Sequence, residues 1–471
     1  MIPARLEPLL AADGVPMVLA RLFTEGGREL YLVGGSVRDA LLGRRRGDEE
    51  HDFATDARPT EVRRLVAGWA DDLYTVGETF GTIGLIKGGV RAEITTFRAE
   101  VYRDDSRKPI VQFADDLETD LSRRDFTVNA TALRLVPGPE IIDPFGGLGD
   151  LGAGLLRTPL DPAVAFADDP LRMLRLFRFV SVLGFRADGP AVAAVREMRE
   201  RLAIVSAERV RDELDKLLVG EHVEEGLRGL VDSGLAGEFL PEFAALRLEQ
   251  DPIHQHKDVL AHTIAVVGRC PSDRILRLAA LFHDVGKPET RSFGPDGVAF
   301  HHHEVVGARM ARARMRELRY ARADIQEVSG LVYLHLRPHT LKLGWTDRAV
   351  RRYVRDAGSL LERLNTLVRC DVTTRDPKKA RAVERRIDEL EERIAALREQ
   401  EELDAIRPPI DGHAVMAFLG IPPGPLVGEV MELLLEHRLD EGPYSEEEAF
   451  ELVRGWAEER GMEVGGGGVL S

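Results

Sequence analysis

A strand-like run that ends in two glycines constrains this chain more than any other feature. Residues 30–33, Leu-Tyr-Leu-Val, are apolar and are followed by Gly34 and Gly35. An apolar run that stops at a glycine pair is typical of a strand that ends in a tight turn. The next residues predict a short helix that is capped by Ser36, with Asp39 completing a capping box. The first expected unit is therefore strand, Gly-Gly turn, helix.

A second strand is predicted at residues 50–55, after a basic loop. Glu50 and Asp52 are one residue apart, so on a strand both side chains point to the same face. Two such carboxylates can share a pair of Mg²⁺ ions, and the backbone N–H groups of a Gly-Gly turn can bind a polyphosphate. Either feature alone is weak, since most acidic runs are solvated loops. Together, in this order, they predict phosphoryl-transfer chemistry.

Composition and charge limit the class of protein. A chain of 471 residues is too long for one ordinary core, so three or four domains are expected. No apolar run approaches the length that crosses a bilayer, and the first residues lack a signal pattern. Two cysteines, Cys270 and Cys370, give no disulfide framework and favour a reducing cytoplasm. The net charge of −16 argues against wholesale coating of nucleic acid but allows a local basic track.

Further polar residues interrupt apolar runs before residue 137. Glu93 lies inside the strand-like run 90–96, where a carboxylate is costly unless it serves a function. A third metal-facing carboxylate and a solvated edge-strand residue are equally supported. Arg123 and Arg124 precede an apolar helix and can hold phosphates, although their spacing alone slightly favours a surface pair. Asp125 and Asn129, four residues apart, are expected to share one helix face.

A row of charged side chains marks the helical region that begins near residue 151. Asp169, Arg172, Arg175 and Arg178 recur at three-residue spacing, which places them on one side of a helix. The more common interpretation of such a row is a surface ion-pair ladder. The alternative is that it presents hydrogen-bond donors and acceptors to the edge of a nucleotide base.

The section from about residue 241 to 376 contains most of the histidines. An adjacent His-Asp pair follows an apolar stretch, and burial of such a pair is unfavourable unless it binds metal or pairs with neighbours. Residues 301–303 alone can be a solvated loop. The candidate metal ligands are His262, His283, Asp284, His303, His335 and Asp371.

Two helical patterns follow. Four arginines at i, i+3, i+4 and i+7 form a stripe that can contact a phosphate backbone, although a solvated face is at least as well supported. The stripe consists of Arg348, Arg351, Arg352 and Arg355. A 4-3-4-3 apolar spacing in residues 383–397 predicts a short coiled-coil-like seam.

In combination, these motifs resemble the bacterial CCA-adding tRNA nucleotidyltransferase and poly(A) polymerase family, in the branch fused to an HD domain, with a C-terminal part most like actinobacterial-type members. The motifs in chain order are LVGGSVRDALLGR, EITTFRAE, YRDDSRKP, DLSRRDFTVNA, DDPLRMLRLFRF, SAERVRDEL and LFHDVGK. The resemblance implies an α+β fold, with a polymerase-β-like nucleotidyltransferase head around a small mixed sheet and helices elsewhere. The implied domains are a head at 1–150, a nucleotide-selecting and RNA-binding neck at 151–240, an HD metal-binding domain at 241–376 and a tRNA-binding tail at 377–471.

The resemblance also implies roles for residues and overturns the preference for a surface pair at Arg123 and Arg124. Gly35 and Arg38 would hold the triphosphate, and Arg124 and Asp125 would hold phosphate and ribose. Asp169 and Arg172 would read the base edge of CTP or ATP, supported by Arg175 and Arg178. The implied nucleotide-binding set is Gly34, Gly35, Ser36, Arg38, Arg124, Asp125, Asn129, Asp169, Arg172, Arg175 and Arg178.

The implied reaction is template-independent addition of CCA to tRNA from CTP and ATP, by attack of the tRNA 3′-hydroxyl on the α-phosphate and release of pyrophosphate. Mg²⁺ would be held by Glu50 and Asp52, with Glu93 as a third catalytic carboxylate. The family's pair is normally Asp-x-Asp, whereas this chain has Glu50-x-Asp52, and Asp48 is the fallback for the first position.

The product and the second activity have alternatives. The loop 102–109 resembles the flexible loop needed to move from C to A addition, which favours full CCA addition over an A-adding enzyme or a poly(A) polymerase. The HD residues form one implied site from His262, His283, Asp284 and Asp371. His303 and His335 can complete a second, with a divalent transition metal and phosphatase or cyclic phosphodiesterase activity on RNA ends. A different class is an HD phosphohydrolase with an RNA-binding head.

Overall fold

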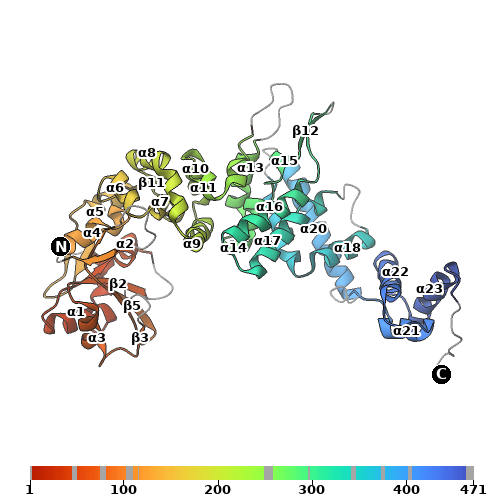
Figure 1. Cartoon of the computed structure of the whole chain (residues 1–471), viewed down its shortest axis with the longest axis horizontal. Coiled ribbons are helices and arrows are strands. Elements are labelled where there is room, and N and C mark those ends of the chain that lie inside the picture. The colour runs from red at the N-terminus through yellow and green to blue at the C-terminus, as the bar shows by residue number, and fades with distance from the viewer. Residues whose placement is uncertain are drawn as a thin grey trace. The chain divides into compact units, whose positions relative to one another are not determined.

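The computed structural model describes residues 3–44, 50–74, 81–101, 110–114, 116–248, 258–294, 297–340, 346–372, 377–400 and 406–462. The chain divides into two compact units (Figure 1). The first consists of Met1–Ala245 with Arg314–Tyr320, and the second of Leu246–Ala313 with Ala321–Ser471. No helix among the described residues is long and apolar enough to span a membrane.

A seven-stranded mixed sheet forms the centre of the N-terminal part of the first unit, as predicted. Its order is β3-β4-β5-β2-β1-β8-β9, and β2 runs parallel to β5 while the other neighbours are antiparallel. Its strands are β1 (Leu30–Val33), β2 (Glu50–Thr55), β3 (Asp72–Tyr74), β4 (Thr82–Lys87), β5 (Val90–Thr96), β8 (Ala132–Arg134) and β9 (Glu140–Ile142). A separate antiparallel pair is β6 (Arg98–Val101) with β7 (Ile110–Phe113).

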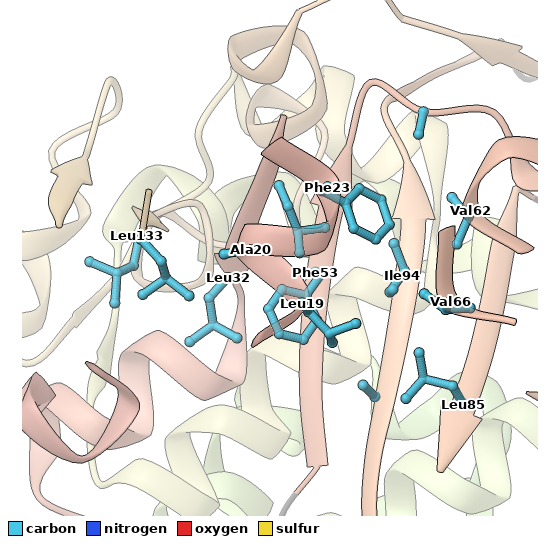
Figure 2. Packing of buried hydrophobic residues seen from close by; sticks show 14 of the residues in the cluster. Leu19, Ala20, Phe23, Leu32, Phe53, Val62, Val66, Leu85, Ile94 and Leu133 are labelled. Atoms are coloured by element: carbon cyan, nitrogen blue, oxygen red, sulfur yellow. The ribbon is translucent and has the colours of Figure 1, made fainter. Parts of the chain in front are cut away.

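Alternation along β1 and β2 divides their side chains between two cores. Leu32 and Phe53 are fully buried against helices α1 (Val15–Glu25) and α3 (Pro59–Val66). The same cluster includes Phe23 of α1 and Ile94 of β5 (Figure 2). The neighbouring residues Tyr31, Val33 and Ala54 belong to a second cluster on the other face. Because side chains two residues apart share a face, Glu50 and Asp52 lie on the Ala54 face, away from α1 and α3.

Helices make up the rest of the first unit. The central one is α7 (Leu171–Leu183), which packs against α9 (Ala207–Leu218) and α10 (Val223–Asp232). A side chain at Gly229 of α10 would overlap the ring of Phe177, so this close approach of the helices requires glycine. The remaining helices are α2 (Gly35–Leu42), α4 (Leu117–Ser122), α5 (Gly147–Ala153), α6 (Pro162–Asp168), α8 (Gly189–Met198), α11 (Ala236–Phe239) and α12 (Pro241–Ala244), with a short parallel pair β10 (Leu155–Leu156) and β11 (Arg186–Ala187).

The described residues of the second unit form helices and one hairpin, which consists of β12 (Arg291–Gly294) and β13 (Gly297–Phe300). The predicted apolar seam lies on α20, where its four residues from Ile387 to Leu397 are buried. The helices are α13 (Val259–Arg269), α14 (Arg274–Phe282), α15 (Lys287–Thr290), α16 (His303–Glu317), α17 (Arg322–Leu334), α18 (Asp347–Ala357), α19 (Leu361–Cys370), α20 (Pro377–Gln400), α21 (Gly412–Leu419), α22 (Pro425–Glu441) and α23 (Glu446–Glu459).

The arginine stripe lies on α18 and contacts α22 within the second unit. Arg352 pairs with Glu436 and with Asp440, whose carboxylate also lies 2.7 Å from Arg348 Nε. Arg351 is buried and donates to the carbonyl oxygen of Leu439 at 3.3 Å. These side chains therefore hold α18 and α22 together in this structure. Neither the phosphate-contact interpretation nor the solvated-face interpretation predicted this role.

Candidate nucleotide and metal sites

The glycine turn is formed as predicted, but its helix is not capped as predicted. Gly34 has φ +66° and precedes α2, which begins at Gly35 without a side-chain cap. The Ser36 hydroxyl instead donates to the carbonyl oxygen of Glu50 at 3.3 Å and accepts from the N–H of Asp52 at 3.3 Å. The capping prediction for Ser36 and Asp39 is therefore wrong. Ser36 attaches the start of α2 to β2, and so fixes the turn beside Asp52.

The turn leaves room for a ligand because it has no side chain. A Cβ atom at Gly34 would lie 3.2 Å from Nη1 of Arg124 and 3.7 Å from Oδ2 of Asp52. A side chain there would also be strained at this φ. The backbone, one guanidinium and one carboxylate thus converge on the same space, which suits a phosphate that contacts N–H groups and a cation.

Asp52 and Glu93 are neighbours across the parallel strands β2 and β5, where they are register partners. Both line a cavity, whereas Glu50 is exposed at the start of β2 and is not among the described residues that line it. Burial raises the pKa of Glu93, and the negative charges of Asp52 and Glu50 raise it further. Carboxylates that disfavour one another's charge fit a site for a divalent cation, which would relieve the repulsion. Asp48 lies outside the described residues.

The cavity has a volume of about 810 Å³ and lies wholly within the first unit. Among the described residues, nine basic and six acidic side chains line it, so this lining is positive in a chain whose net charge is −16. Such a balance favours an anionic ligand. The basic residues are Arg38, Arg98, Arg123, Arg124, Arg172, Arg175, Arg178, Arg209 and Lys216.

Asp125 is the most strongly held carboxylate of the cavity. It is buried, and its Oδ2 accepts from Nε and Nη2 of Arg175 at 2.9 and 2.5 Å, while Asn129 Nδ2 donates to Oδ1 at 2.8 Å. Burial favours the neutral acid, but the charge of Arg175 and these hydrogen bonds outweigh it and hold the pKa of Asp125 well below its usual range. Asp125 follows α4 rather than lying on a helix, so the predicted shared helix face with Asn129 is wrong, although the two side chains do contact.

Arg38 and Asn129 complete this wall of the cavity. Arg38 is buried and donates to Oδ1 of Asn129 at 2.6 Å and to both carboxylate oxygens of Asp39 at 2.8 and 2.9 Å. The guanidinium of Arg124 lies 3.1 Å from Asp120. A buried arginine with fixed partners has little freedom to reorient, so its remaining N–H donors already have a fixed orientation before a ligand binds.

The charged row near α7 lines the cavity, but its members have different environments. Asp169 precedes α7, accepts from the N–H of Leu171 at 3.1 Å and pairs with Arg209 of α9 at 2.9 Å. Arg172 is buried and donates to the carbonyl oxygens of Ala165, at 3.1 Å, and Arg123. Those bonds fix Arg172 and leave its orientation independent of any ligand.

Glu213 of α9 organises the other two arginines. Its carboxylate is buried and lies 3.3 Å from Nη1 of Arg175 and 3.0 Å from Nε of Arg178. Burial and the neighbouring charge of Arg175 lower the pKa of Arg178 to about 10. Neither Glu213 nor Arg209 is among the residues predicted for the site. Glu213 could have been found in the sequence as a carboxylate on the same helix face as the apolar residues Val210 and Leu214.

The predicted metal ligands of the second unit come together from five helices. His262 lies within α13, and the other ligands lie at the ends of α14, α16, α17 and α19. His262 Nε2 lies 2.9 Å from Oδ1 of Asp371 and 3.4 Å from Nε2 of His283. Asp284 reaches both halves of the cluster, with Oδ2 at 3.3 Å from His283 Nε2 and Oδ1 at 3.3 Å from His303 Nε2. Two overlapping groups have metal-ligand spacing, and they share Asp284: His262, His283 and Asp284, and Asp284, His303 and His335.

Hydrogen bonds orient three of these imidazoles. The Nδ1 atoms of His283, His303 and His335 lie 2.7, 2.9 and 2.7 Å from the carbonyl oxygens three residues earlier in the chain. A neutral imidazole that donates from Nδ1 to a carbonyl has an unprotonated Nε2, which is the form that binds a metal. Burial and the neighbouring His283 lower the pKa of His335 to about 3, which keeps that ring neutral. The donor set therefore fits a divalent transition metal.

Two other predictions concern residues 301–303 and the loop 102–109. His301 and His302 are exposed, so of residues 301–303 only His303 joins the cluster. The loop 102–109, which bears on C-to-A addition, lies outside the described residues.

Family models match three successive parts of the chain. They are the poly A polymerase head domain at residues 30–157, the probable RNA and SrmB-binding site of polymerase A at residues 184–246, and the HD domain at residues 259–396. The chain is 35% identical to the A-adding tRNA nucleotidyltransferase of Deinococcus radiodurans over 91% of its own length and 95% of that protein. It is 41% identical to the CCA-adding enzyme of Bacillus pumilus, over 48% of its own length and 54% of that protein.

Solved structures agree with the fold. The CCA-adding enzyme of Bacillus stearothermophilus in complex with CTP superposes with a TM-score of 0.70 and 25% identity, over 98% of this chain and 99% of that one. The Thermotoga maritima CCA-adding enzyme complexed with tRNA gives a TM-score of 0.59 at 21% identity, which supports the fold alone.

The fold and the matched domains define an enzyme of the polymerase-head nucleotidyltransferase class that carries an HD domain. Its near full-length similarity to the A-adding tRNA nucleotidyltransferase of Deinococcus radiodurans makes the assignment more specific. The chain belongs to the tRNA nucleotidyltransferase family.

Proposed function

We propose that the first unit adds nucleotides to the 3′ end of tRNA, with CTP and ATP as substrates and CCA as the product, in the cytoplasm. The observation that carries this proposal is one cavity in which the Gly34 turn, the Asp52 and Glu93 carboxylates and the residues Asp169 and Arg172 all meet. A nucleoside triphosphate needs these three kinds of groups: N–H donors and cations for phosphates, carboxylates for metal, and fixed polar groups for the base.

Within this proposal, each wall of the cavity has a task. Gly35 and Arg38 bind the triphosphate, with Arg124 beside it, and Asp125 with Asn129 orients the ribose. Asp169 and Arg172 face the base edge, while Arg175 and Arg178 position the groups around them. Because Asp125 and Arg172 are buried and already bonded, the cavity is organised before the nucleotide enters.

The carboxylates define where a metal would be held. Asp52 and Glu93 are the principal candidates because both line the cavity, and Glu50 is a further candidate beside them. A bound pair of Mg²⁺ ions supplies Lewis-acid activation of the tRNA hydroxyl and of the departing pyrophosphate. The chain's own part is to keep these carboxylates on one face, with Ser36 holding β2 against the glycine turn.

A second candidate product is the terminal adenosine alone. It is favoured by the relative from Deinococcus radiodurans, which is named an A-adding enzyme and matches nearly the full length, whereas the matches to CCA-adding relatives from Bacillus cover about half of those proteins. CCA remains our first proposal because CCA-adding enzymes match at higher identity, 41% and 42%, over 48% and 45% of this chain.

The product is tested with three tRNA transcripts that end at the discriminator base, at C and at CC. Each is incubated with CTP alone, ATP alone and both, and the 3′ ends are sequenced. CCA addition predicts extension of all three to CCA when both nucleotides are present. Extension of only the CC-ending transcript would replace this proposal by A addition. Homopolymer growth from ATP alone would indicate a poly(A) polymerase.

We also propose that the His and Asp cluster of the second unit binds a divalent transition metal and hydrolyses phosphate esters. The carrying observation is the convergence of buried Nε2 and carboxylate atoms, with three imidazoles fixed through Nδ1. A metal in such a site supplies an activated water for attack on phosphorus. The chain's own contribution includes Lys287, whose Nζ lies 2.6 Å from Oδ2 of Asp284, and which can also contact a phosphate oxygen.

Loss of the metal ligands is expected to empty this centre. His283→Ala combined with Asp284→Ala should weaken metal binding by more than about 100-fold, because one ligand from the first group and the carboxylate shared by both are removed. Metal content after dialysis, measured by mass spectrometry of the digested protein, checks this. His302→Ala is the matched control, since that histidine is exposed and outside the cluster. Equal metal content in the double variant and the unmodified protein would refute the assignment.

A further inference from the structure

A β-hairpin joins two parts of the metal cluster and has no role in the proposals above. It follows Asp284 in the chain and precedes His303, and its strands β12 and β13 pair with Arg291 opposite Phe300 and Phe293 opposite Val298 (Figure 1). The last strand residue is bonded to the cluster, since the carbonyl oxygen of Phe300 accepts from His303 Nδ1 at 2.9 Å. The hairpin is therefore attached directly to a metal ligand.

One face of this hairpin carries cations and aromatic rings. Side chains two apart on a strand share a face, so Arg291 and Phe293 lie together, and Phe300 joins them from the opposite strand. The guanidinium carbon of Arg291 lies 4.7 Å from the centroid of the Phe293 ring. Phe293 is 55% exposed, so much of this stacked pair is open to solvent. A single exposed phenylalanine needs no explanation, but its stacking on an arginine makes a defined surface.

The same face continues to the metal cluster. Nζ of Lys287 lies 5.7 Å from the centroid of the Phe300 ring and 2.6 Å from Oδ2 of Asp284. The order along the face is thus Phe293, Arg291, Phe300 and Lys287, ending at Asp284. Aromatic rings and guanidinium planes stack on nucleobases, and the two cations attract phosphate groups.

We propose that the hairpin face of Phe293 and Arg291 is a stacking platform for the terminal base of single-stranded RNA, which places the phosphate at that RNA end on the HD centre. The proposal deepens the hydrolase function proposed above and rests on it, because it assigns the residues that hold the RNA end beside the metal centre. Stacking is tolerant of base identity, so the platform selects for a nucleotide rather than for a sequence.

Binding is measured with a trinucleotide that has 2-aminopurine as its last base and a 3′-phosphate. The phosphate blocks extension at the head, and saturating CTP and ATP occupy the nucleotide cavity. Stacking quenches the 2-aminopurine fluorescence, and Phe293→Ala should weaken binding about tenfold and relieve the quench. Phe293→Tyr should retain both. Phe113→Ala is the matched control, because that ring is 39% exposed and lies 4.5 Å from the guanidinium of Arg58, far from the HD motif in the sequence.

Hydrolysis separates failure of the platform from failure of the hydrolase. For the metal-loaded protein, Phe293→Ala should lower kcat/KM for the trinucleotide about tenfold and leave that for p-nitrophenyl phosphate unchanged. If Phe293→Ala binds, quenches and hydrolyses the trinucleotide like the unmodified protein, the platform is refuted and the hydrolase stands. If the unmodified protein hydrolyses neither substrate with Mn²⁺, Co²⁺, Ni²⁺ or Mg²⁺, the hydrolase is refuted, and the binding ratio alone decides whether the hairpin stacks on RNA.

Discussion

Asp52→Asn is expected to reduce nucleotide incorporation into tRNA by at least about 10³-fold, because loss of a metal-binding carboxylate removes several kcal/mol of transition-state stabilisation. The amide keeps the size of the side chain and the β2 backbone bond to Ser36, so the fold should be unchanged. The measurement is single-turnover addition of the first nucleotide, with saturating CTP and Mg²⁺.

Comparison with Glu50→Gln shows which of the two carboxylates, Glu50 or Asp52, binds the catalytic metal. Glu50 is exposed and lies outside the lining of the cavity, so its variant should lose far less activity than Asp52→Asn. Glu93→Gln should resemble Asp52→Asn, since Glu93 is the register partner of Asp52. Full activity of Asp52→Asn would contradict the head assignment. Equal losses for Asp52→Asn and Glu50→Gln would instead make Glu50 the partner ligand despite its exposure.

Asp169→Ala is expected to lower discrimination between CTP or ATP and the wrong nucleotides UTP and GTP by at least about 10²-fold, because a site that hydrogen-bonds its substrate rejects analogues that leave buried polar groups unpaired. The carboxylate accepts from the N–H of Leu171 and pairs with Arg209, so its oxygens are fixed at the cavity wall. The measurement is kcat/KM for each of the four nucleotides on one tRNA transcript.

The control for base selection is Asp212→Ala on α9. Asp212 is an exposed carboxylate that pairs with Arg211, and it is not one of the described residues that line the cavity. The variant should keep the nucleotide preference of the unmodified protein. If Asp169→Ala lowers kcat/KM equally for all four nucleotides, Asp169 supports the cavity wall but does not read the base. Arg172→Ala should then be tested alone.

Local patterns in the sequence predicted the features that depend on local geometry. The strand, glycine turn and second strand follow from hydrophobic runs and turn residues, and alternation along β2 places Glu50 and Asp52 on one face. Glu93 was a candidate because a carboxylate in mid-strand is unfavourable without a partner, although the sequence supported a solvated position equally, and it lines the cavity. The His and Asp cluster was recognisable for the same reason, since His283 and Asp284 follow the mainly apolar helix α14. The α+β class and mixed sheet are confirmed.

Contacts between distant residues were not predictable in this way. Ser36 matches a helix cap in sequence, but its hydroxyl bonds to β2 because the turn brings Glu50 O and Asp52 N within reach. Glu213 and Arg209 gain their roles only when α9 packs on α7. The arginine stripe of α18 has the spacing of a phosphate-binding face, yet its partners on α22 are carboxylates and, for Arg351, backbone carbonyls, all more than 80 residues away in the sequence. Periodicity indicates which side chains share a face, and packing determines what that face meets.

The bonds of Arg175 have a consequence for dissecting the chain. Its guanidinium pairs with Asp125, 50 residues earlier, and with Glu213, 38 residues later, and both carboxylates are buried. A fragment that stops near residue 150 would retain Asp125 but lack α7 and its arginine, so the contacts that hold this carboxylate at the cavity wall would be lost. We therefore expect the polymerase head and the helices after it to unfold as one cooperative unit. A chimera that exchanges the heads of two relatives should have its junction after α9. The residues equivalent to Asp125, Arg175 and Glu213 then all come from the same protein.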